Sequence, residues 1–285
     1  MTAHYFDHPL VHLHYYKFGK GDKVMLCFHG YGMHGKQFTL LESGLGDQYT
    51  FYGFDLFFHK QTRLKDQSLA AVKKGISKQQ MALLIEDFCR EHHIDKFSLI
   101  GYSMGSHYAT AIMEQLPHRV SEYIVAAASS LGPGRVVLFL SRTRLGNKLL
   151  EKIALTDNGM LYLLKLIHKI GIVDRAGYDI LYKEIATYEL RFSFYATATF
   201  LRDFITDRKR LIRAINTHAV KSIFIFGKRD KMYPPSLGNT VIPHIPSAQK
   251  IILNEGHEMI NSNFAKALTA ALYDHQTEET SLSGL

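Results

Sequence analysis

The chain has 285 residues, of which 46% are hydrophobic, and it carries a formal net charge of +8 at pH 7. This length suffices for one large hydrophobic core, or for a core with a modest insertion, and the composition excludes a chain that is disordered throughout. The sequence contains no run of about 18 or more apolar residues, so it offers no candidate for a membrane-spanning helix and we expect a soluble protein.

The amino terminus and the cysteines indicate the compartment. Met1–Pro9 lacks the basic start and the apolar run of a secretory signal, so we expect a mature cytoplasmic protein. Cys27 and Cys89 each lie in an apolar run, where a free thiol behaves as a small hydrophobe, and no disulfide framework is expected. The histidines show no metal-ligand spacing, and no motif implies a cofactor, so we expect neither a metal nor a cofactor.

Short apolar runs alternate with segments of helical period along the chain. His4–Phe18 alternates polar and apolar residues, which predicts an antiparallel hairpin at a sheet edge. The later runs are apolar throughout, as in strands that helices cover on both faces. These runs are Val24–Phe28, Phe97–Gly101, Tyr123–Ser129, Ser222–Gly227 and Lys250–Leu253. Between them, Met81, Ile85 and Phe88 follow the spacing of one helix face. The alternation predicts a doubly wound, mostly parallel α/β sheet.

One long segment interrupts this alternation. Residues 132–215 show only helical patterning broken by glycines, and the segment is far longer than a usual connection between strands. We interpret it as an all-helical insertion rather than as a run of peripheral helices, with the core formed by 1–131 and 216–285. The insertion holds fifteen Lys or Arg and eight Asp or Glu, a difference of +7, and so accounts for nearly all of the net charge.

A helix within the insertion is both apolar and basic. Met160–Ile170 presents a broad apolar surface, and we expect Lys165, His168 and Lys169 to cluster opposite to it. Such a helix either covers an apolar pocket or packs with a solvated basic face, and we favour the second interpretation. Peripheral contact with a membrane through this basic segment is an alternative. Nucleic acid is not an expected partner, because no recognition motif accompanies the charge.

A sharp turn carries the first candidate catalytic residue. The predicted strand ends at Gly101, and Tyr102-Ser103-Met104-Gly105 and a helical pattern over His107–Leu116 follow. Glycine on both sides of the serine lets the strand and the helix approach closely, because a β-carbon would not fit there. The turn lifts Ser103 toward a cleft at the start of a helix, where the N–H of Met104 is available to a developing anion.

Two further candidates follow the last two predicted strands. Asp230 comes shortly after the run that ends at Gly227, and His257 after the run that ends at Leu253. Consecutive strands of a parallel sheet end at the same edge, so Ser103, Asp230 and His257 are expected to meet there. This combination is chemically meaningful, because a serine hydroxyl needs a base and the base needs a third group to orient it.

These positions resemble the motifs of the α/β-hydrolase fold family. The matching residues are His29-Gly30 after the third strand, the turn 101–105, Asp230 after the seventh strand and Gly256-His257 after the eighth. Their order, nucleophile then acid then histidine, is the order of the family. The resemblance spans almost the whole chain. It implies an α/β-hydrolase core with a helical cap, residues 132–215, inserted between strands 6 and 7.

The resemblance also implies a serine hydrolase mechanism. Ser103 would attack the substrate, His257 would accept and return the proton, and Asp230 would orient His257. The substrate would be a carboxylic ester or a related acyl compound, partly apolar, and the reaction would pass through an acyl-enzyme on Ser103. The oligomeric state has no signature in the sequence.

The resemblance also assigns an oxyanion hole to two backbone amides. The N–H groups of Tyr31, which follows His29-Gly30, and of Met104 would bind the oxyanion, with Gly32 as the alternative to Tyr31. His29 is a competing base, although the histidine at this position in the family shapes the loop.

Two other carboxylates are alternatives to Asp230 as the residue that orients His257. Asp55 and Glu258 compete with Asp230, and some relatives draw the acid from another strand. Asp55 ends an apolar run where family members often have an acidic residue before a Gly-x-Gly-x-Ser loop, but Leu56-Phe57-Phe58-His59 follows it here. The loop geometry of the family is therefore not transferred, and an apolar pocket wall or simple packing is the favoured interpretation. His107 is interpreted as a residue of the helix face rather than as a ligand.

Other functions fit the same residues. A carbon–carbon bond hydrolase, a thioesterase or a lyase would use the same three side chains. Dehalogenation and epoxide opening on this fold need an aspartate nucleophile, and Ser103 occupies that position. A ligand-sensing protein that retains the three residues with little turnover is the alternative from a different class.

Overall fold

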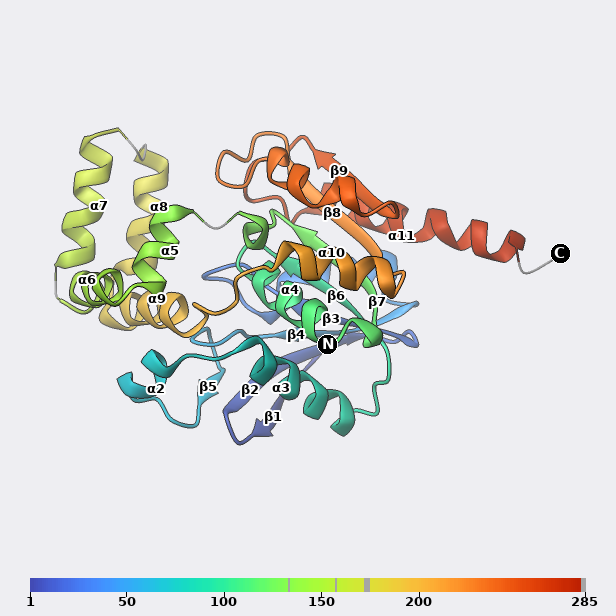
Figure 1. Ribbon diagram of the computed structural model, residues 1–285, viewed down its shortest axis with the longest axis horizontal. Coiled ribbons are helices and arrows are strands. Elements are labelled where there is room, and N and C mark those ends of the chain that lie inside the picture. Colours follow the sequence, from blue (N-terminus) through green and yellow to red (C-terminus); the bar gives the residue numbers. More distant parts are fainter. Residues whose placement is uncertain (133, 157, 172–174, 283–285) are drawn as a thin grey trace.

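The computed structural model describes residues 1–132, 134–156, 158–171 and 175–282, and its centre is a twisted sheet (Figure 1). The described residues form nine strands in the order β1-β2-β4-β3-β6-β7-β8-β9, with β5 paired to β2. The pairs β1–β2, β2–β4 and β2–β5 are antiparallel, and all other pairs are parallel. The strands are β1 (Thr2–His8), β2 (Val11–Gly19), β3 (Lys23–Phe28), β4 (Tyr49–Phe54), β5 (Arg63–Leu64), β6 (Phe97–Tyr102), β7 (Val120–Ala126), β8 (Lys221–Gly227) and β9 (Ala248–Leu253).

The ends of several strands differ from the predicted runs, and one strand was not expected. The run expected to extend over Tyr123–Ser129 ends at Ala126, because Ala127 adopts a positive φ of 45° and the 3-10 helix η3 (Ser129–Leu131) follows. The two-residue strand β5 was not expected, because so short a segment carries no periodic signal. Because β5 is counted, strands 6, 7 and 8 of the family order correspond to β7, β8 and β9 here.

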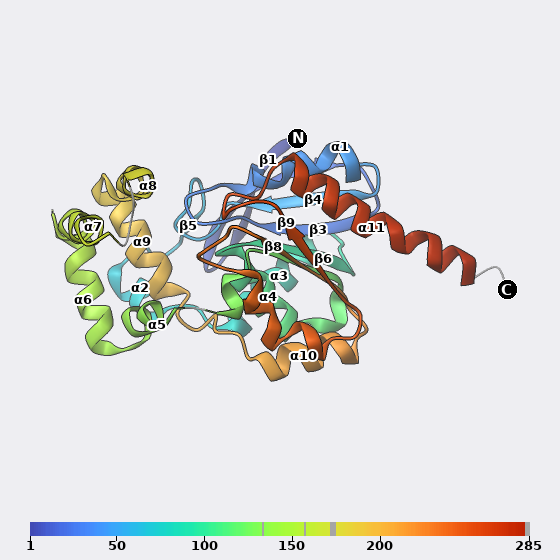
Figure 2. The same cartoon turned by 90° about the horizontal axis from the view of Figure 1, so that it is seen from above.

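Helices cover both faces of the sheet (Figures 1 and 2). Residues of β3 alternate between two separate clusters, with Leu26 and Phe28 in one and Met25 and Cys27 in the other, as the pleat of a strand requires. The first cluster includes α3 (Lys78–Glu91), α4 (Gly105–Gln115) and α10 (Arg208–Thr217), and the second includes η1 (Gly35–Leu41), α1 (Glu42–Leu45) and α11 (Ser262–Leu282). Further short helices are α2 (Leu69–Lys74), η2 (Pro117–Arg119), η4 (Pro235–Thr240) and η5 (Ile242–His244).

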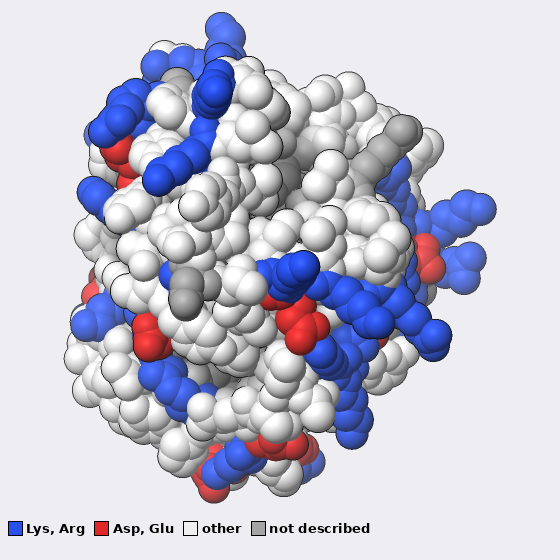
Figure 3. All heavy atoms as spheres, turned by 90° about the vertical axis from the view of Figure 1, so that its left-hand side faces the viewer, with Lys and Arg blue, Asp and Glu red and all other residues white. Residues whose placement is uncertain are grey.

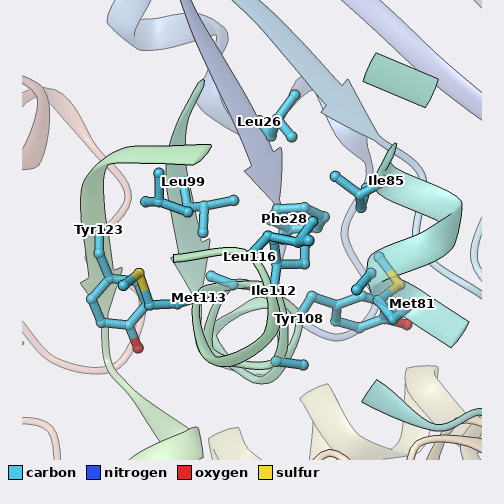
Figure 4. Close-up of a cluster of buried hydrophobic side chains, with 14 of the residues drawn as sticks. Leu26, Phe28, Met81, Ile85, Leu99, Tyr108, Ile112, Met113, Leu116 and Tyr123 are labelled. Carbon is cyan, nitrogen blue, oxygen red and sulfur yellow. The ribbon is translucent and has the colours of Figure 1, made fainter. Parts of the chain in front are cut away.

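Helix α4 occupies the centre of the first cluster (Figure 4). Its Tyr108 and Ile112 are fully buried in this cluster, which also holds Phe28 of β3 and Met81 of α3, and the ring of Tyr108 stacks on that of Phe28. Burial of an aromatic or aliphatic side chain of this size stabilises a fold by about 1.5 to 3 kcal/mol. The packing holds α4 against the sheet and so fixes the position of the turn that precedes it.

Gly105, the first residue of α4, lies against β3. A methyl group at this position would stand 1.9 Å from the carbonyl oxygen of Phe28, which belongs to the backbone of a buried strand. We expect Gly105→Ala to lower the free energy of unfolding by about 3 kcal/mol or more, measured by urea denaturation. Gly256→Ala is the matched control, because nothing lies within 4 Å of a methyl group there. Equal losses in the two variants would contradict this account.

Five helices follow β7 and form a separate layer, here called the cap, beyond the carboxyl edge of the sheet (Figure 1). They are α5 (Arg135–Arg142), α6 (Arg144–Leu155), α7 (Gly159–Lys169), α8 (Arg175–Ile185) and α9 (Tyr188–Phe200), and no strand lies among their described residues. Leu150, Leu164 and Tyr195 are buried in the cap's own apolar cluster, which Val72 of α2 joins. None of the described helices is long and apolar enough to cross a membrane.

The predicted range of the insertion, 132–215, also contains α10. That helix packs on α4, and its Leu211 and Ile215 belong to the core cluster rather than to the cap cluster. Its apolar spacing is that of any amphipathic helix, so the sequence did not reveal which layer it would join. The division of the chain into a core and a cap therefore stays a prediction, with α5–α9 as the helices that it concerns.

Candidate active site

Ser103 lies in a tight turn between β6 and α4. Its φ of 49° falls in the left-handed region that residues other than glycine rarely adopt. The N–H of Ser103 donates to the carbonyl of Ala126 at 2.9 Å, and the hydroxyls of Ser106 and Ser129 donate to the carbonyl of Ser103 at 2.6 and 2.7 Å. These hydrogen bonds hold the strained conformation, and only 8% of the Ser103 surface is exposed.

The loops after β8 and β9 bring two side chains to this serine. The Oγ of Ser103 lies 3.2 Å from Nε2 of His257, and Nδ1 of His257 lies 2.9 Å from Oδ2 of Asp230. The other oxygen of Asp230, Oδ1, accepts hydrogen bonds from the backbone N–H groups of Met232 and Tyr233, both at 2.9 Å. The three residues predicted from the sequence thus stand in one hydrogen-bonded chain.

The electrostatic environment of Asp230 favours its charged form. Burial alone raises the pKa of this carboxyl, which is only 3% exposed, but its hydrogen bonds to His257 and to two backbone amides outweigh burial and lower the pKa below the ordinary 3.8. An ionised Asp230 accepts the proton on Nδ1 of His257. The lone pair of the neutral ring then lies on Nε2, facing Ser103.

Tyr102 links the turn to the loop that carries the histidine. Its hydroxyl donates to the backbone carbonyl of His257 at 2.6 Å, and a methyl group at Gly30 would stand 2.8 Å from its ring. The sequence did not indicate this role, because Tyr102 occupies the variable position of the Gly-x-Ser-x-Gly pattern. The loops after β8 and β9 are also joined directly, since the N–H of Arg229 donates to the carbonyl of Glu255 at 2.9 Å.

Two backbone amides near Ser103 have free donors. Within the part of the chain that the structure describes, the N–H groups of Tyr31 and Met104 make no hydrogen bond. Met104 precedes the first turn of α4, where the helix dipole favours a negative charge. Gly32, the alternative to Tyr31, adopts a φ of 75° and lies under the carboxylate of Glu184, which stands 2.7 Å from the place of a methyl group.

His29 is fully engaged in holding this loop. Its Nδ1 donates to the carbonyl of Gly30 at 2.6 Å, and its Nε2 accepts from the N–H of Leu56 at 3.0 Å. Burial lowers the pKa of His29 well below its usual value, so the ring is neutral. With both nitrogens occupied, His29 has no lone pair for Ser103, which fits the loop-shaping interpretation.

Among the described residues, neither competing acid is hydrogen-bonded to the ring of His257, whose Nδ1 pairs with Asp230. Asp55 is completely buried and contacts Nδ1 of His14 at 2.8 Å and the N–H of Gly35 at 2.8 Å, so it braces the loops that follow β3 and β4. Packing was the interpretation favoured for Asp55 from the sequence, and its polar role was missed because His14 lies in the distant amino-terminal hairpin. Glu258 is exposed, as expected of a solvated neighbour. His107 donates to the carbonyl of Phe204 at 3.0 Å and behaves as a packed helix residue.

A cavity of about 550 Å³ adjoins the loop of Tyr31 and Gly32, between the core and the cap. Its apolar walls include Phe58, Leu64 and Phe192. Two cations and two acids also line it, and they balance in number: Lys60, Arg63, Glu184 and Glu189. No group of side chains that would hold a metal ion occurs among the residues described.

Comparison with known proteins identifies the fold. The family model described as "alpha/beta hydrolase fold" matches residues 23–161, and the doubly wound, mostly parallel sheet that the sequence predicts is confirmed. No curated protein matches the sequence.

Several solved structures share this fold at low identity. An esterase from Thermogutta terrifontis is 15% identical, with 94% of each chain covered and a TM-score of 0.68. A meta-cleavage product hydrolase from Pseudomonas fluorescens is 17% identical, with 93% of this chain and 95% of that chain covered and a TM-score of 0.63. A thioesterase domain from the curacin biosynthetic pathway is 17% identical, with coverage of 95% and 98% and a TM-score of 0.63.

Proposed function

The chain belongs to the alpha/beta hydrolase fold family, and from this premise we propose that it is a serine hydrolase that cleaves a carboxylic ester or a related acyl compound. The observation that carries the proposal is the hydrogen-bonded chain from Ser103 through His257 to Asp230. A hydroxyl, an imidazole and a carboxylate in this order are what acyl transfer through a serine nucleophile requires.

In the first half of the proposed reaction, Ser103 forms the new bond. Its Oγ attacks the carbonyl carbon of the substrate while its proton moves to Nε2 of His257. Asp230, ionised at neutral pH, stabilises the imidazolium that results. His257 then gives the proton to the departing alcohol oxygen, the bond from the carbonyl carbon to that oxygen breaks, and an acyl-enzyme remains on Ser103.

In the second half, water replaces the alcohol. His257 takes a proton from the water, whose oxygen attacks the acyl carbon, and then returns the proton to Oγ of Ser103 as the carboxylic acid leaves. In both halves the substrate oxygen becomes an oxyanion. The unpaired N–H groups of Tyr31 and Met104 are proposed to bind it, and loss of one such donor typically lowers kcat by about 10²- to 10³-fold.

Tyr31 lines the cavity described above, whereas Ser103 and His257 do not, so the cavity is proposed to receive the part of the substrate beyond the reacting carbonyl, a partly apolar group without a net charge. Its aromatic and aliphatic walls suit an acyl chain or an aryl group, and its equal numbers of acids and cations leave no excess of either sign. His59 adds no charge, because burial lowers its pKa to about 4. We propose that α5–α9 act as a cap that selects the substrate through this cavity.

Labelling with a fluorophosphonate tests whether Ser103 is an activated nucleophile. We expect one adduct at neutral pH, located on Ser103 by mass spectrometry of the digested protein, with aryl esters of short acids as the first substrates. Labelling without ester turnover would favour a ligand-sensing protein or one of the thioester, carbon–carbon or lyase reactions, which a panel of such substrates separates. The absence of an adduct, with the protein folded, would contradict the serine mechanism itself.

A further inference from the structure

The outermost helices of the cap expose apolar and basic side chains together. We call this surface the outer cap face, and it consists of Arg144, Leu145, Lys148, Leu149 and Lys152 of α6, of Tyr162, Leu163, Lys165, Leu166 and Lys169 of α7, and of Ile170, which follows α7 directly. All of these residues are exposed, and α6 and α7 pack beside each other at the end of the molecule farthest from α11 (Figures 1 and 2).

On α7 the apolar and basic residues share one face. Tyr162, Leu166 and Ile170 follow helical spacing and are 70%, 54% and 59% exposed, and Lys165 and Lys169 lie among them. The expectation that the lysines would lie opposite the whole apolar surface was therefore wrong. Helix α7 has apolar residues on two sides. Met160 and Leu164 are buried in the apolar cluster of the cap, whereas the apolar residues on the opposite side are not covered.

Helix α6 repeats this arrangement. Leu145 and Leu149 are 72% and 46% exposed, and Arg144, Lys148 and Lys152 occupy neighbouring positions on the same exposed side. A surface of this kind is costly in water, because its leucine side chains stay hydrated where burial would stabilise them.

The charge of the outer cap face is strongly positive. It carries five cations, whereas the described residues of α6 and α7 include a single acid, Glu151. The carboxylate of Glu151 already contacts Nζ of Lys73 on α2 at 2.8 Å. Figure 3, which looks onto this end of the molecule, shows Lys and Arg side chains on either side of a broad area without charge. The cations of the outer cap face are therefore not compensated by acids of α6 and α7.

We propose that the outer cap face docks on an anionic lipid surface. Leucine, isoleucine and tyrosine side chains enter the boundary between head groups and acyl chains, while lysine and arginine lay their aliphatic stems over it and keep their charges at the lipid phosphates. Each such cation adds roughly fivefold to partitioning onto an anionic bilayer. The outer cap face of a second copy is a poor partner, because the cations of the two faces would repel each other.

Vesicle flotation tests the proposal on the full chain. We expect binding to vesicles of phosphatidylcholine mixed with phosphatidylglycerol, little binding to phosphatidylcholine alone, and weaker binding in about 1 M NaCl, where the Debye length is about 3 Å. The double variant Lys165→Glu, Lys169→Glu is expected to bind at least about 20-fold more weakly. Leu163→Ser with Leu166→Ser is expected to bind at least about tenfold more weakly.

Matched controls separate docking from general charge and from catalysis. Lys20→Glu with Lys266→Glu changes the same charge at two exposed lysines away from the cap and is expected to bind within about twofold of the unaltered chain. All variants should retain the thermal unfolding midpoint and the rate of fluorophosphonate labelling, so that a failure of docking is distinct from a failure of the proposed chemistry.

Three results would overturn the proposal. The first is equal binding to neutral and anionic vesicles, and the second is equal weakening by the control pair and the cap pairs. The third is a concentration-dependent dimer in sedimentation experiments that disappears in the variant Leu163→Ser, Leu166→Ser. Such a dimer would show that a second copy covers the outer cap face.

Discussion

Ser103→Ala is expected to lower kcat for an aryl ester by about 10⁴-fold or more. The variant lacks the oxygen that is proposed to become acylated, whereas the amides of Tyr31 and Met104 and the cavity beside Tyr31 are unchanged. The residual rate therefore measures what these parts supply alone. The measurement is a stopped-flow time course with excess substrate. In the unaltered protein we expect a burst of alcohol release whose amplitude approaches the enzyme concentration, and in the variant no burst.

The control for this experiment is Ser43→Ala, which removes an exposed serine hydroxyl outside the site. It should leave both the burst and the steady rate unchanged. A burst that persists in Ser103→Ala would show that another residue carries the acyl group, and the proposed mechanism would then be wrong.

For Asp230→Asn we expect kcat to fall by about 10³- to 10⁴-fold with a smaller change in KM. The amide group of asparagine can donate to Nδ1 of His257, which moves the ring proton to Nε2 and removes the lone pair that faces Ser103. The variant also loses the charge that stabilises the imidazolium. Steady-state kinetics on the same aryl ester, together with the rate of fluorophosphonate labelling, measure both effects.

Glu258→Gln is the matched control, because it removes a carboxylate next to His257 that is exposed and was a competing candidate for the acid. It should retain activity within about twofold. Equal losses in the two variants would mean that the negative potential near His257 matters, rather than the hydrogen bond that Asp230 accepts from Nδ1 of His257.

The pH dependence of stability gives a separate test of the Asp230 environment. Its pKa in the folded protein is lowered from 3.8, so its ionised form stabilises the fold above about pH 4, and this contribution is lost as the pH falls through the lower folded value. The difference in thermal midpoint between the unaltered chain and Asp230→Asn should therefore shrink as the pH falls below 3.8. A difference that grows on acidification would contradict the lowered pKa.

The parts of this protein that the sequence predicted well depend on local patterns. The strand before Ser103 and the strands before Asp230 and His257 are short apolar runs, and parallel pairing places their carboxyl ends together whatever the helices between them contain. The glycines of the turn are equally local, because Gly101 lies against α4 and Gly105 lies against β3, so close contact excludes a side chain at either position. For these reasons three residues that lie far apart along the chain could be assigned to one site from the sequence.

The features that the sequence missed depend on contacts between distant segments. Asp55 meets His14 from another strand, Tyr102 meets the carbonyl of His257, and α10 joins the core although its pattern resembles that of the cap helices. The spacing of residues along the chain does not indicate which distant residues will be in contact. The outer row of α7 illustrates the same limit, because an apolar periodicity does not tell which row a partner helix covers.

The proposed reacting groups all belong to loops that leave β3, β6, β8 and β9, and none belongs to α5–α9. The chain passes from the core into these helices after η3 and returns before α10, so the segment is connected to the rest by two peptide links. The segment α5–α9 can therefore be replaced as one piece by altering the chain at two places. If α5–α9 select the substrate as proposed, grafting the corresponding helices of another alpha/beta hydrolase between these two links is expected to change the range of substrates while Ser103, His257 and Asp230 stay in place.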